Sequence, residues 1–350
     1  MMRVAELIAR HSFRLSGREI ENPKPGYVQV RVASVGVCGS DLHNFADGHV
    51  GDTPSVYPMV LGHEPAGVVV KMGDGVAGWS AGDEALLEPA IYCYHCEFCM
   101  SGRHNVCSNL RFLSQPEDPG FFRDFVNLPA RNLLPLPKGL SMLQATLFEP
   151  LAVVLHSMKF AQPRPGETAV VFGAGPIGQM TVAVLKMSGM SRVWAVDPIA
   201  HRREQALKAG ADAAIDPRAD DPVKQIMADT GKRGVDMAID CAALGPSMNQ
   251  CLHVVRNAGR VVITAIPAEA EPRLQFHVMR RKEVALFNVR RSNHESELAL
   301  HLLVEHNARF APMITHTRPL EKVEEAFFIL ERYEDGVGKI VIDLANSSAP

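Results

Sequence analysis

The residues from 168 to 263 repeat one pattern, an apolar run followed by a longer amphipathic stretch, and this pattern limits the fold more than any other feature. TAVVFGAG leads into PIGQMTVAVLKMSG, VWAVD into HRREQALKAG, and GVDMAID into PSMNQCLHVV, after which GRVVITAI follows. Strands that alternate with helices of ten or more residues form βαβ units, which require a parallel sheet covered by helices. We therefore predict a doubly wound α/β domain of the Rossmann type over residues 151–287.

The first of these strands runs into a glycine-rich turn that opens a helix. The turn has the G-x-G-x-x-G form and consists of Gly173, Ala174, Gly175, Pro176, Ile177 and Gly178. Glycines there let the backbone approach a pyrophosphate, which the helix N-terminus then binds. Asp197 ends the next strand, where a carboxylate accepts hydrogen bonds from the ribose hydroxyls of NAD. These residues predict an NAD site, although Arg202, which we include in it, and Arg203 could instead favour the 2′-phosphate of NADP.

The pattern of apolar and polar residues is different on both sides of this region. Before residue 150, short runs such as YVQVRVASVGV and GVVVKM lie between Gly, Pro and Asp, and the valines of the first run alternate with polar or small residues, as in a half-buried strand. After about residue 287 the pattern loosens and ends in a helix over 320–332 and a strand, GKIVIDL. We therefore predict a β-rich domain over 1–150 and a further segment over 288–350.

Four of the seven cysteines lie in the stretch CYHCEFCMSGRHNVC, as Cys93, Cys96, Cys99 and Cys107. Disulfides suit small secreted domains, whereas a chain of 350 residues can bury a sufficient core without them. Charged residues in MMRVAELIARHSF prevent an apolar signal core, so we expect a reducing, cytoplasmic setting, in which clustered cysteines indicate metal. The C-x2-C-x2-C-x7-C spacing suits a closed zinc tetrahedron, so we predict a structural zinc lobe over residues 92–110.

Three further segments carry residues of the kind that bind zinc. VGVCGSDLH contains Cys38, Ser40, Asp41 and His43, LGHEPAG contains His63 and Glu64, and LFEPLAVVLH contains Glu149 and His156. Thiolate, imidazole and carboxylate together suit a catalytic zinc with one open position. Each residue alone also fits a structural role, as a small buried thiol, a core histidine or a carboxylate at a helix start.

Composition narrows the classes of partner. The net charge is −3 without a run of lysines and arginines, which argues against nucleic acid or an anionic membrane as the main partner. The longest uncharged stretch, residues 168–185, is interrupted by glycines, a proline and a glutamine, so we do not expect a membrane span.

In their order along the chain, these motifs resemble those of the zinc-dependent medium-chain dehydrogenase family, the alcohol and polyol dehydrogenases. VCGSDLH resembles the first catalytic-zinc segment, GHEPAG the second, CYHCEFCMSGRHNVC the structural-zinc lobe, and GAGPIG with Asp197 the NAD site. The resemblance implies a GroES-like catalytic domain that is split in sequence around a Rossmann domain. It also implies a homo-oligomer, a tetramer rather than a dimer.

The resemblance assigns roles to the ligand-type residues. Cys38 and His63 would bind the catalytic zinc, with Glu64 or Glu149 completing the shell. Ser40 and His43 would form a relay for the proton that alcohol oxidation releases. His156 is expected to be structural, and His95 and His104 to take no part in binding the second zinc.

The sequence limits the identity of the substrate less than that of the metal and the cofactor. HNFADGHVGDTPSVYPMVLGHE resembles sorbitol- and idonate-type dehydrogenases, and VRRSN resembles a segment that places Arg290 near substrate and cofactor. Asn44 and Arg291 depart from the polyol pattern and make the pocket more polar, so a sugar acid competes with a neutral polyol. Vicinal diols and L-threonine also remain open as substrates.

Other functional classes share this fold. Some relatives lack the zinc ligands and serve as quinone reductases or as structural proteins that keep the cofactor, but the ligand-type residues are all present here. A zinc hydrolase would leave the dinucleotide site without a purpose. We therefore predict a zinc- and NAD-dependent oxidoreductase that acts on a secondary hydroxyl.

Overall fold

A computed structural model describes residues 1–243 and 246–345 and divides the chain into two compact units. Unit 1 consists of Met1–Glu149 and Ser296–Pro350, and unit 2 of Pro150–Glu295. The second boundary lies at residue 295 and not near 287. The reason is that β17 (Ala285–Asn288) is a strand of the unit 2 sheet, and Glu295 bonds His156 of the same unit.

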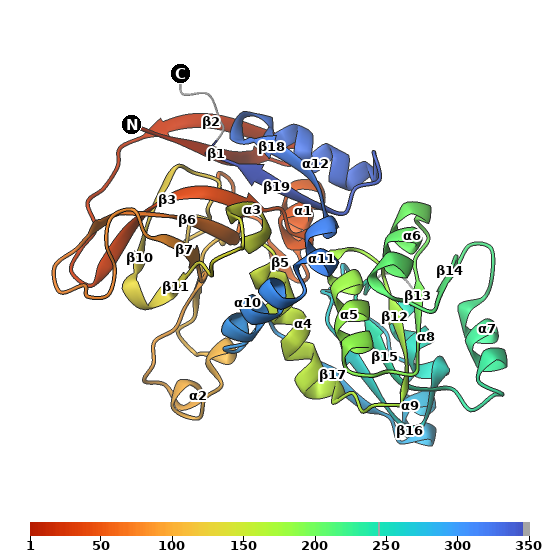
Figure 1. Cartoon of the computed structure of the whole chain (residues 1–350). Helices are drawn as coiled ribbons and strands as arrows, with labels where there is room; N and C mark the ends of the chain where they lie inside the picture. Colours follow the sequence, from red (N-terminus) through yellow and green to blue (C-terminus); the bar gives the residue numbers. More distant parts are fainter. Residues whose placement is uncertain (244–245, 346–350) are drawn as a thin grey trace. The chain divides into compact units, whose positions relative to one another are not determined.

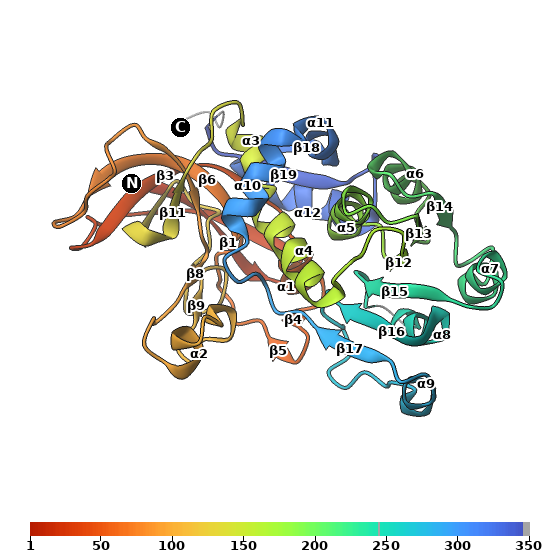
Figure 2. The same ribbon diagram turned by 60° about the horizontal axis from the view of Figure 1, so that its bottom comes forward.

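Unit 2 contains the predicted doubly wound parallel sheet. Its strand order is β14-β13-β12-β15-β16-β17, and every neighbouring pair is parallel. The other strands are β12 (Thr168–Phe172), β13 (Arg192–Val196), β14 (Ala213–Ile215), β15 (Val235–Asp240) and β16 (Val255–Ile263). The helices are α5 (Pro176–Met187), α6 (Ala200–Ala209), α7 (Pro222–Asp229), α8 (Ser247–Val254) and α9 (Phe276–Lys282). Helices α5 and α6 pack together, and α7, α8 and α9 form a second group (Figures 1 and 2).

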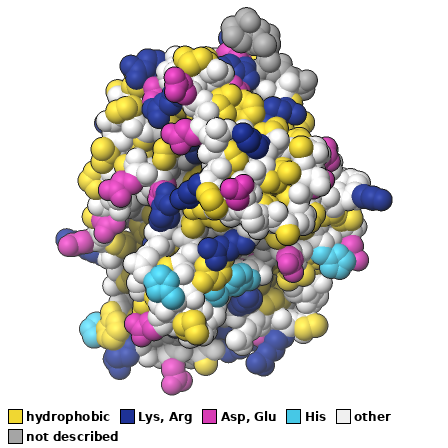
Figure 3. Space-filling view, turned by 90° about the vertical axis from the view of Figure 1, so that its left-hand side faces the viewer, with side chains coloured by type: hydrophobic (Ala, Val, Ile, Leu, Met, Phe, Trp, Pro, Cys, Tyr) yellow, Lys and Arg dark blue, Asp and Glu magenta, His cyan; other side chains and the backbone are white. Residues whose placement is uncertain are grey.

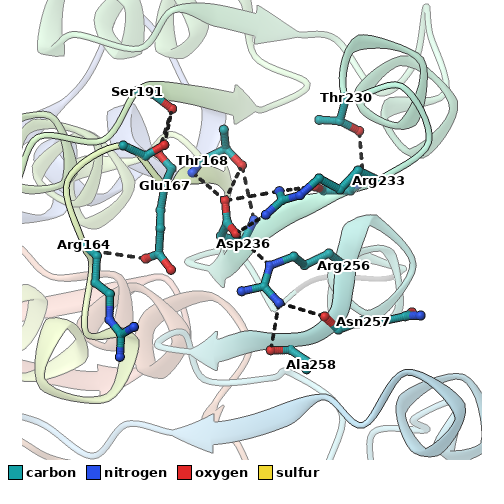
Figure 4. Close-up of polar contacts among 12 residues, drawn as sticks. Arg164, Glu167, Thr168, Ser191, Thr230, Arg233, Asp236, Arg256, Asn257 and Ala258 are labelled. Carbon is teal, nitrogen blue, oxygen red and sulfur yellow. Dashed lines mark hydrogen bonds and ion pairs between the residues drawn. The ribbon is translucent and has the colours of Figure 1, made fainter.

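The strands of this sheet are apolar because helices cover them. Strand β15 is buried along its whole length, although it carries Asp236 and Asp240. Asp236 accepts hydrogen bonds from Arg233, Arg256 and Thr168, as Figure 4 shows. Asp240 accepts from two backbone amides and from Ser247 Oγ. Both buried carboxylates therefore have several donors, as buried charges require.

Unit 1 is β-rich and is built around a mixed sheet of order β11-β7-β6-β3-β19-β18, with β10 also paired to β3. Only β18 and β19 run parallel among these pairs. The strands of this sheet are β3 (Tyr27–Gly36), β6 (Glu64–Met72), β7 (Glu84–Leu87), β10 (Phe125–Pro129), β11 (Leu133–Pro135), β18 (Ile314–Pro319) and β19 (Lys339–Asp343). The separate two-stranded pairs are β1 (Met2–Ala9) with β2 (Ser12–Arg18), β4 (His49–Val50) with β5 (Thr53–Pro54), and β8 (Ala90–Ile91) with β9 (Arg111–Phe112).

Short helices complete unit 1. They are α1 (Gly39–Ala46), α2 (Glu97–Met100), α3 (Met142–Ala145), α10 (Ser296–Glu305), α11 (Asn307–Phe310) and α12 (Val323–Arg332), with 3-10 turns η1 (His104–Val106), η2 (Ala130–Asn132), η3 (Ala311–Met313) and η4 (Leu320–Lys322). Helix α4 (Phe148–Ala161) begins in unit 1 and continues into unit 2. Phe45, Phe121, Phe122 and Phe327 are fully buried in one core under the sheet, and α12 packs against α1.

Strand pairing brings distant parts of unit 1 together at Gly36. This residue ends β3, pairs with Glu64 at the start of β6, and pairs with Val341 of β19 on the other side. Cys38 and helix α1 follow directly. Strands from both ends of the chain therefore meet where the ligand-type residues begin.

The predicted lobe leaves unit 1 between β8 and β9, which pair and close its base. It carries α2, labelled in Figure 1, and η1. Elsewhere on the surface, charges of both signs are mixed on the face drawn in Figure 3. Among the described residues, no helix combines the length and the apolar character that a bilayer crossing needs.

Candidate active site

A thiol, an imidazole and a carboxylate from the predicted segments meet in unit 1. The ligand atoms of Cys38, His63 and Glu64 all lie within 4.8 Å of one another. Cys38 is the N-cap residue of α1, and His63 immediately precedes β6, whose first residue is Glu64. His63 and Glu64 are buried. These three residues provide the donor types that zinc prefers, so the set fits a zinc ion.

Asp41 orients His63 and was not assigned a role from the sequence. Its Oδ1 lies 3.3 Å from His63 Nδ1 and accepts hydrogen bonds from Ser114 Oγ at 2.9 Å and Gly62 N at 3.3 Å. Burial disfavours charge on both partners, but their mutual attraction prevails, so the pKa of His63 is raised and that of Asp41 is lowered. Nδ1 faces the Asp41 carboxylate at ion-pair distance but without hydrogen-bond geometry, so Nε2 is the atom left for a metal.

Lys339 is the second residue that the sequence did not reveal. Its Nζ lies 2.6 Å from Glu64 Oε1 and 2.5 Å from Oε2, and donates to Val37 O at 3.1 Å. Burial alone would lower the pKa of Lys339, but the charge of Glu64 outweighs it and the pKa is raised. Glu64 therefore has a cationic partner already, and a metal ion would share its carboxylate with Lys339.

Glu149, the other candidate carboxylate, lies in the first turn of α4 and is also buried. Burial raises the pKa of Glu149 to about 7, with opposing influences from His63 and Lys339 that lower it and from Glu64 that raises it. These influences place Glu149 in the same electrostatic environment. It is not one of the three residues whose ligand atoms lie within 4.8 Å.

Ser40, His43 and Asn44 lie on α1 beside the set. Ser40 Oγ is 3.5 Å from both Cys38 Sγ and His63 Nε2. His43 is partly exposed, and its Nδ1 lies 2.7 Å from Asp47 Oδ2. Asn44 is buried, and its amide is engaged by Ser55 Oγ and Ser40 O. These two contacts hold the Asn44 side chain in place, and its role toward a substrate stays a prediction.

The four clustered cysteines form a second candidate metal site. Their sulfur atoms all lie within 4.8 Å of one another, and all seven cysteines of the chain are free. Sγ of Cys93 lies 3.4 Å from that of Cys107 and 3.9 Å from that of Cys99. A zinc tetrahedron with bonds of about 2.3 Å separates its sulfurs by about 3.8 Å, so this set fits a zinc ion. Backbone amides, those of His95 and Cys96, lower the pKa of the Cys93 thiol to about 5.

Aromatic contacts support the lobe around these cysteines. His104 packs against Tyr92 and Tyr94, at ring-centroid distances of 5.4 Å and 5.2 Å, and the Arg131 guanidinium lies 4.4 Å from the Tyr94 ring. His95 Nδ1 bonds the carbonyl of Cys93. Neither histidine belongs to the thiol set.

In unit 2, the glycine-rich turn joins β12 to α5. Gly173 has a φ of +86°, and a Cβ on Gly178 would lie 1.9 Å from Gly173 O. Gly175 is the N-cap residue of α5 and Pro176 its first residue, so the amides of the following turn are open at the helix start. Only glycine fits the first and last positions, as a close approach of the helix to the strand requires. Ile177 follows Pro176 in the first turn of α5.

Asp197 follows β13 and is held rigidly beside this turn. Its Oδ2 accepts from Ala174 N at 2.7 Å and its Oδ1 from Ile199 N at 2.8 Å. A Cβ on Gly175 would lie 3.8 Å from Arg202 Cζ, whereas Arg203 bonds the carbonyl of Asp197. A glycine turn, a helix N-terminus and a carboxylate next to it fit a dinucleotide.

The structure also describes the surroundings of two other predicted residues of unit 2. His156 is buried, and its Nδ1 lies 3.0 Å from Glu295 Oε1. Arg290 is exposed in the segment after β17.

A GroES-like unit with two zinc-type ligand sets and a Rossmann unit together define a zinc-dependent dehydrogenase. Residues 24–138 match the family described as alcohol dehydrogenase GroES-like domain, and residues 176–305 match that described as zinc-binding dehydrogenase. The chain belongs to the zinc-dependent medium-chain alcohol and polyol dehydrogenase family, and is an oxidoreductase that uses zinc and a nicotinamide cofactor.

Curated relatives span nearly the whole chain. It is 30% identical to the sorbitol dehydrogenase of Bacillus subtilis (90% of this chain, 89% of the relative) and 32% identical to that of Gallus gallus (92% and 91%). It is 30% identical to the 2-dehydro-3-deoxy-L-galactonate 5-dehydrogenase of Pseudoalteromonas atlantica (97% and 98%).

Solved structures agree with the fold. A zinc-binding dehydrogenase of Sinorhizobium meliloti 1021 bound to NADP has a TM-score of 0.89 at 26% identity. An alcohol dehydrogenase of Escherichia coli CFT073 complexed with NADH has a TM-score of 0.89 at 28% identity. Each comparison covers 98% of this chain and 99% of the other.

Proposed function

We propose that this oxidoreductase uses NAD to oxidise a secondary hydroxyl of a polyol or a sugar acid to the ketone. The observation that carries the proposal is the set of Cys38, which is partly exposed, and the buried His63 and Glu64, which unites the three donor types of a catalytic zinc. Relatives named for sorbitol and for a galactonate derivative support the substrate class.

Cys38 and His63 would hold the catalytic zinc, and Glu64 or Glu149 would complete its shell. A zinc ion held by these residues would supply Lewis-acid chemistry to the substrate hydroxyl, and a nicotinamide cofactor would supply the hydride acceptor. The Asp41 carboxylate 3.3 Å from Nδ1 would favour the form of His63 that binds metal through Nε2. Lys339 balances the charge of Glu64 and so reduces the number of uncompensated anions in the buried site.

Ser40 and His43 would carry the released proton toward solvent. Ser40 Oγ lies 3.5 Å from atoms of both Cys38 and His63, so it would be close to a hydroxyl bound at a metal held by these residues. The bond between His43 Nδ1 and Asp47 leaves Nε2 of His43 free to accept a proton. His43 is partly exposed, which suits the outer end of such a relay.

Asp197 supports NAD over NADP. Its carboxylate is fixed by two backbone amides and would accept hydrogen bonds from the ribose hydroxyls, whereas a 2′-phosphate would meet like charge. Arg202 is the residue that could compensate this repulsion, because it lies over Gly175. The ratio of the two kcat/KM values, measured with NAD and with NADP, tests this part of the proposal; a preference for NADP contradicts it.

The decisive experiment for the activity is a screen of NADH formation by absorbance over polyols, aldonates, vicinal diols and L-threonine. We expect turnover with a polyol or an aldonate. The Cys38→Ala variant should remain folded and lose both turnover and the catalytic zinc. Near-normal activity of folded Cys38→Ala, or turnover with L-threonine alone, would refute the proposal.

Arg290 offers a way to separate the two substrate types. Its exposed guanidinium could pair with the carboxylate of a sugar acid. Arg290→Gln should then raise the KM for an aldonate and leave that for a neutral polyol unchanged.

We also propose a cytoplasmic homo-oligomer, a tetramer rather than a dimer. The clustered cysteines form no disulfide, which suits a reducing compartment. Strand β17 pairs with β16 on one side, and no further strand of the described residues covers its other edge, so a second copy could extend the sheet. Sedimentation velocity would test the oligomeric state; a monomer at all concentrations contradicts it.

A further inference from the structure

Unit 1 contains a cavity that no part of the zinc or cofactor chemistry uses. Its volume is about 280 Å³, and its wall includes Lys24, Tyr27, Arg111, Asp118 and Arg123. None of the candidate metal ligands, relay residues or cofactor residues lines it. A water takes up about 30 Å³ in the liquid, so the cavity has room for a small ion with several waters.

Arg123 has an unusual environment in this wall. Its Nε is inaccessible to solvent and has no hydrogen-bond partner, and its Nη2 donates to Pro119 O at 2.9 Å. The ion pairs of the described part of the chain include none with Arg123. Burial, together with the like charge of Arg18, lowers the pKa of Arg123 to about 10. The residue as a whole is partly exposed, but its Nε is shut off from water, and an anion beside a partly buried cation offsets the unfavourable loss of hydration.

The other charges of the cavity do not supply that anion. Asp118 is already bound by Arg111, through Nε at 2.9 Å and through Nη2. Glu21 lines the cavity and its charge attracts Arg123, which opposes the fall in the pKa of Arg123, but Glu21 is exposed to solvent and forms no ion pair with Arg123 among the described residues. Lys24 adds a second cation, whose Nζ lies 4.2 Å from the centre of the Tyr27 ring. Three cations, Lys24, Arg111 and Arg123, therefore face two carboxylates, Glu21 and Asp118, and one positive charge is left over.

We propose that this cavity binds a small oxyanion, a phosphate or a carboxylate, at the Arg123 guanidinium, with Lys24 as the second cation. The planar fork of an arginine matches two oxygens of either group, and the partly enclosed position strengthens the attraction relative to open water. The ligand replaces the counter-ion that the fold does not provide.

The test is thermal unfolding of the full-length holoenzyme in the presence of inorganic phosphate or of malonate. Sodium chloride at equal ionic strength is the control for both anions. The two anions distinguish a phosphate site from a carboxylate site. A ligand that binds only the folded state raises Tm in a saturable way. We expect such a rise for the unmodified protein with at least one of them, whereas Arg123→Gln should weaken the affinity at least tenfold. Lys138→Gln, which removes an exposed cation outside the cavity, should leave the affinity unchanged.

A second variant should change the affinity for the anion in the opposite direction. Glu21→Gln removes a negative charge from the wall and should tighten anion binding, and the exposure of Glu21 makes this change harmless to folding. The proposal is overturned if neither anion gives a saturable shift, if Arg123→Gln keeps the full response, or if Glu21→Gln binds no more tightly than the unmodified protein. Dehydrogenase turnover should be retained in Arg123→Gln and Glu21→Gln, so this test is independent of the proposed activity.

Discussion

Lys339 and Glu64 form a buried ion pair, with Nζ 2.6 Å from one carboxylate oxygen and 2.5 Å from the other, although 275 residues separate them in the chain. The side chain of Lys339 is 3% exposed and that of Glu64 is fully inaccessible. Strand β19 brings Lys339 beside the end of β3, and the third bond of Lys339, to Val37 O, joins it to the segment that begins with Cys38. The last strand of the described residues thereby fixes a carboxylate of the second catalytic segment.

Lys339→Met should destabilise the metal-free protein by about 3–5 kcal/mol, because it leaves the carboxylate of Glu64 buried without a counter-ion. Zinc should reduce this deficit, since the metal then takes over as partner of Glu64. Lys339→Arg, which keeps the charge, should restore most of the stability. Urea unfolding with chelator and with zinc measures both effects. If metal-free Lys339→Met is as stable as the unmodified protein, the ion pair has no such role.

Gly36 provides the space for this arrangement. A Cβ at residue 36 would lie 2.0 Å from Glu64 Oε2, so Gly36→Ala must displace the carboxylate. We expect the variant to lose about 10–100-fold in affinity for the catalytic zinc, as changes next to metal ligands typically do. Gly39→Ala is the matched control, because a Cβ at residue 39 meets no atom within 4 Å. Zinc titration of both apoproteins measures the effect, and equal affinities would contradict the prediction.

The sequence was sufficient to predict the parallel sheet of unit 2. Its alternating strands and helices are local patterns, and the structure confirms β12, α5, β13, α6, β15, α8 and β16 near the predicted residues. The turn from Gly173 to Gly178 was also predictable, since backbone geometry there admits only glycine at two positions. Helix α10 was not predicted, because its ten residues follow a segment without a clear period.

Lys339 and Asp41 could not be given roles from the sequence. From the sequence, a lysine at the start of a short apolar strand is expected to be solvated, and only the pairing of β19 with β3 brings Lys339 to Glu64. Asp41 stands among the ligand-type residues of its segment, but its contacts with Ser114 and His63 depend on tertiary structure. The boundary near residue 295 was missed for a similar reason, because β17 joins its sheet through a long-range pairing.

The relay proposed for His43 has a measurable signature. His43→Ala should keep its zinc but lose about 10²–10⁴-fold in rate at neutral pH, with partial recovery at high pH or in concentrated small buffers. Asp47→Asn should change the pH–rate profile in the same direction and by less, since it removes only the partner of Nδ1. His49→Ala, a nearby histidine that bonds Gly51 O, serves as control. An unchanged pH–rate profile for His43→Ala would exclude the relay.

Asp236 should stabilise unit 2 in a pH-dependent way. Burial would raise the pKa of Asp236, but hydrogen bonds from Arg233, Arg256 and Thr168 outweigh it and lower the pKa well below its usual value (Figure 4). The folded state therefore favours the carboxylate. This stabilisation is complete above the pKa of the unfolded state, about 3.9, and is lost as the pH falls toward the lower folded pKa.

Asp236→Asn should accordingly lower the free energy of unfolding by about 1.5–3 kcal/mol at neutral pH, because charged hydrogen bonds are lost. The difference from the unmodified protein should stay constant above about pH 5 and narrow below about pH 4. Glu334→Gln, which removes an exposed pair with Arg332, should change stability by less than about 0.5 kcal/mol. Urea unfolding across this pH range tests the prediction, and a difference that grows on acidification would refute it.

The four cysteines of the lobe should hold a second zinc that has no direct chemical role. Four thiolates close the tetrahedron, so no water or alcohol can be activated there. Cys99 is buried among the sulfurs, and Cys99→Ser should lower Tm and reduce bound zinc from two ions to one per chain, since metal binding supplies the folding free energy of such a segment. Met100→Ser, at a neighbouring side chain that is 75% exposed, should change neither Tm nor the amount of bound zinc.

Molecules of Cys99→Ser that remain folded should keep their affinity for substrate, because the sulfur set shares no residue with Cys38, His63 or Glu64. Metal analysis that finds one zinc per chain in the active, unmodified protein would exclude the second site.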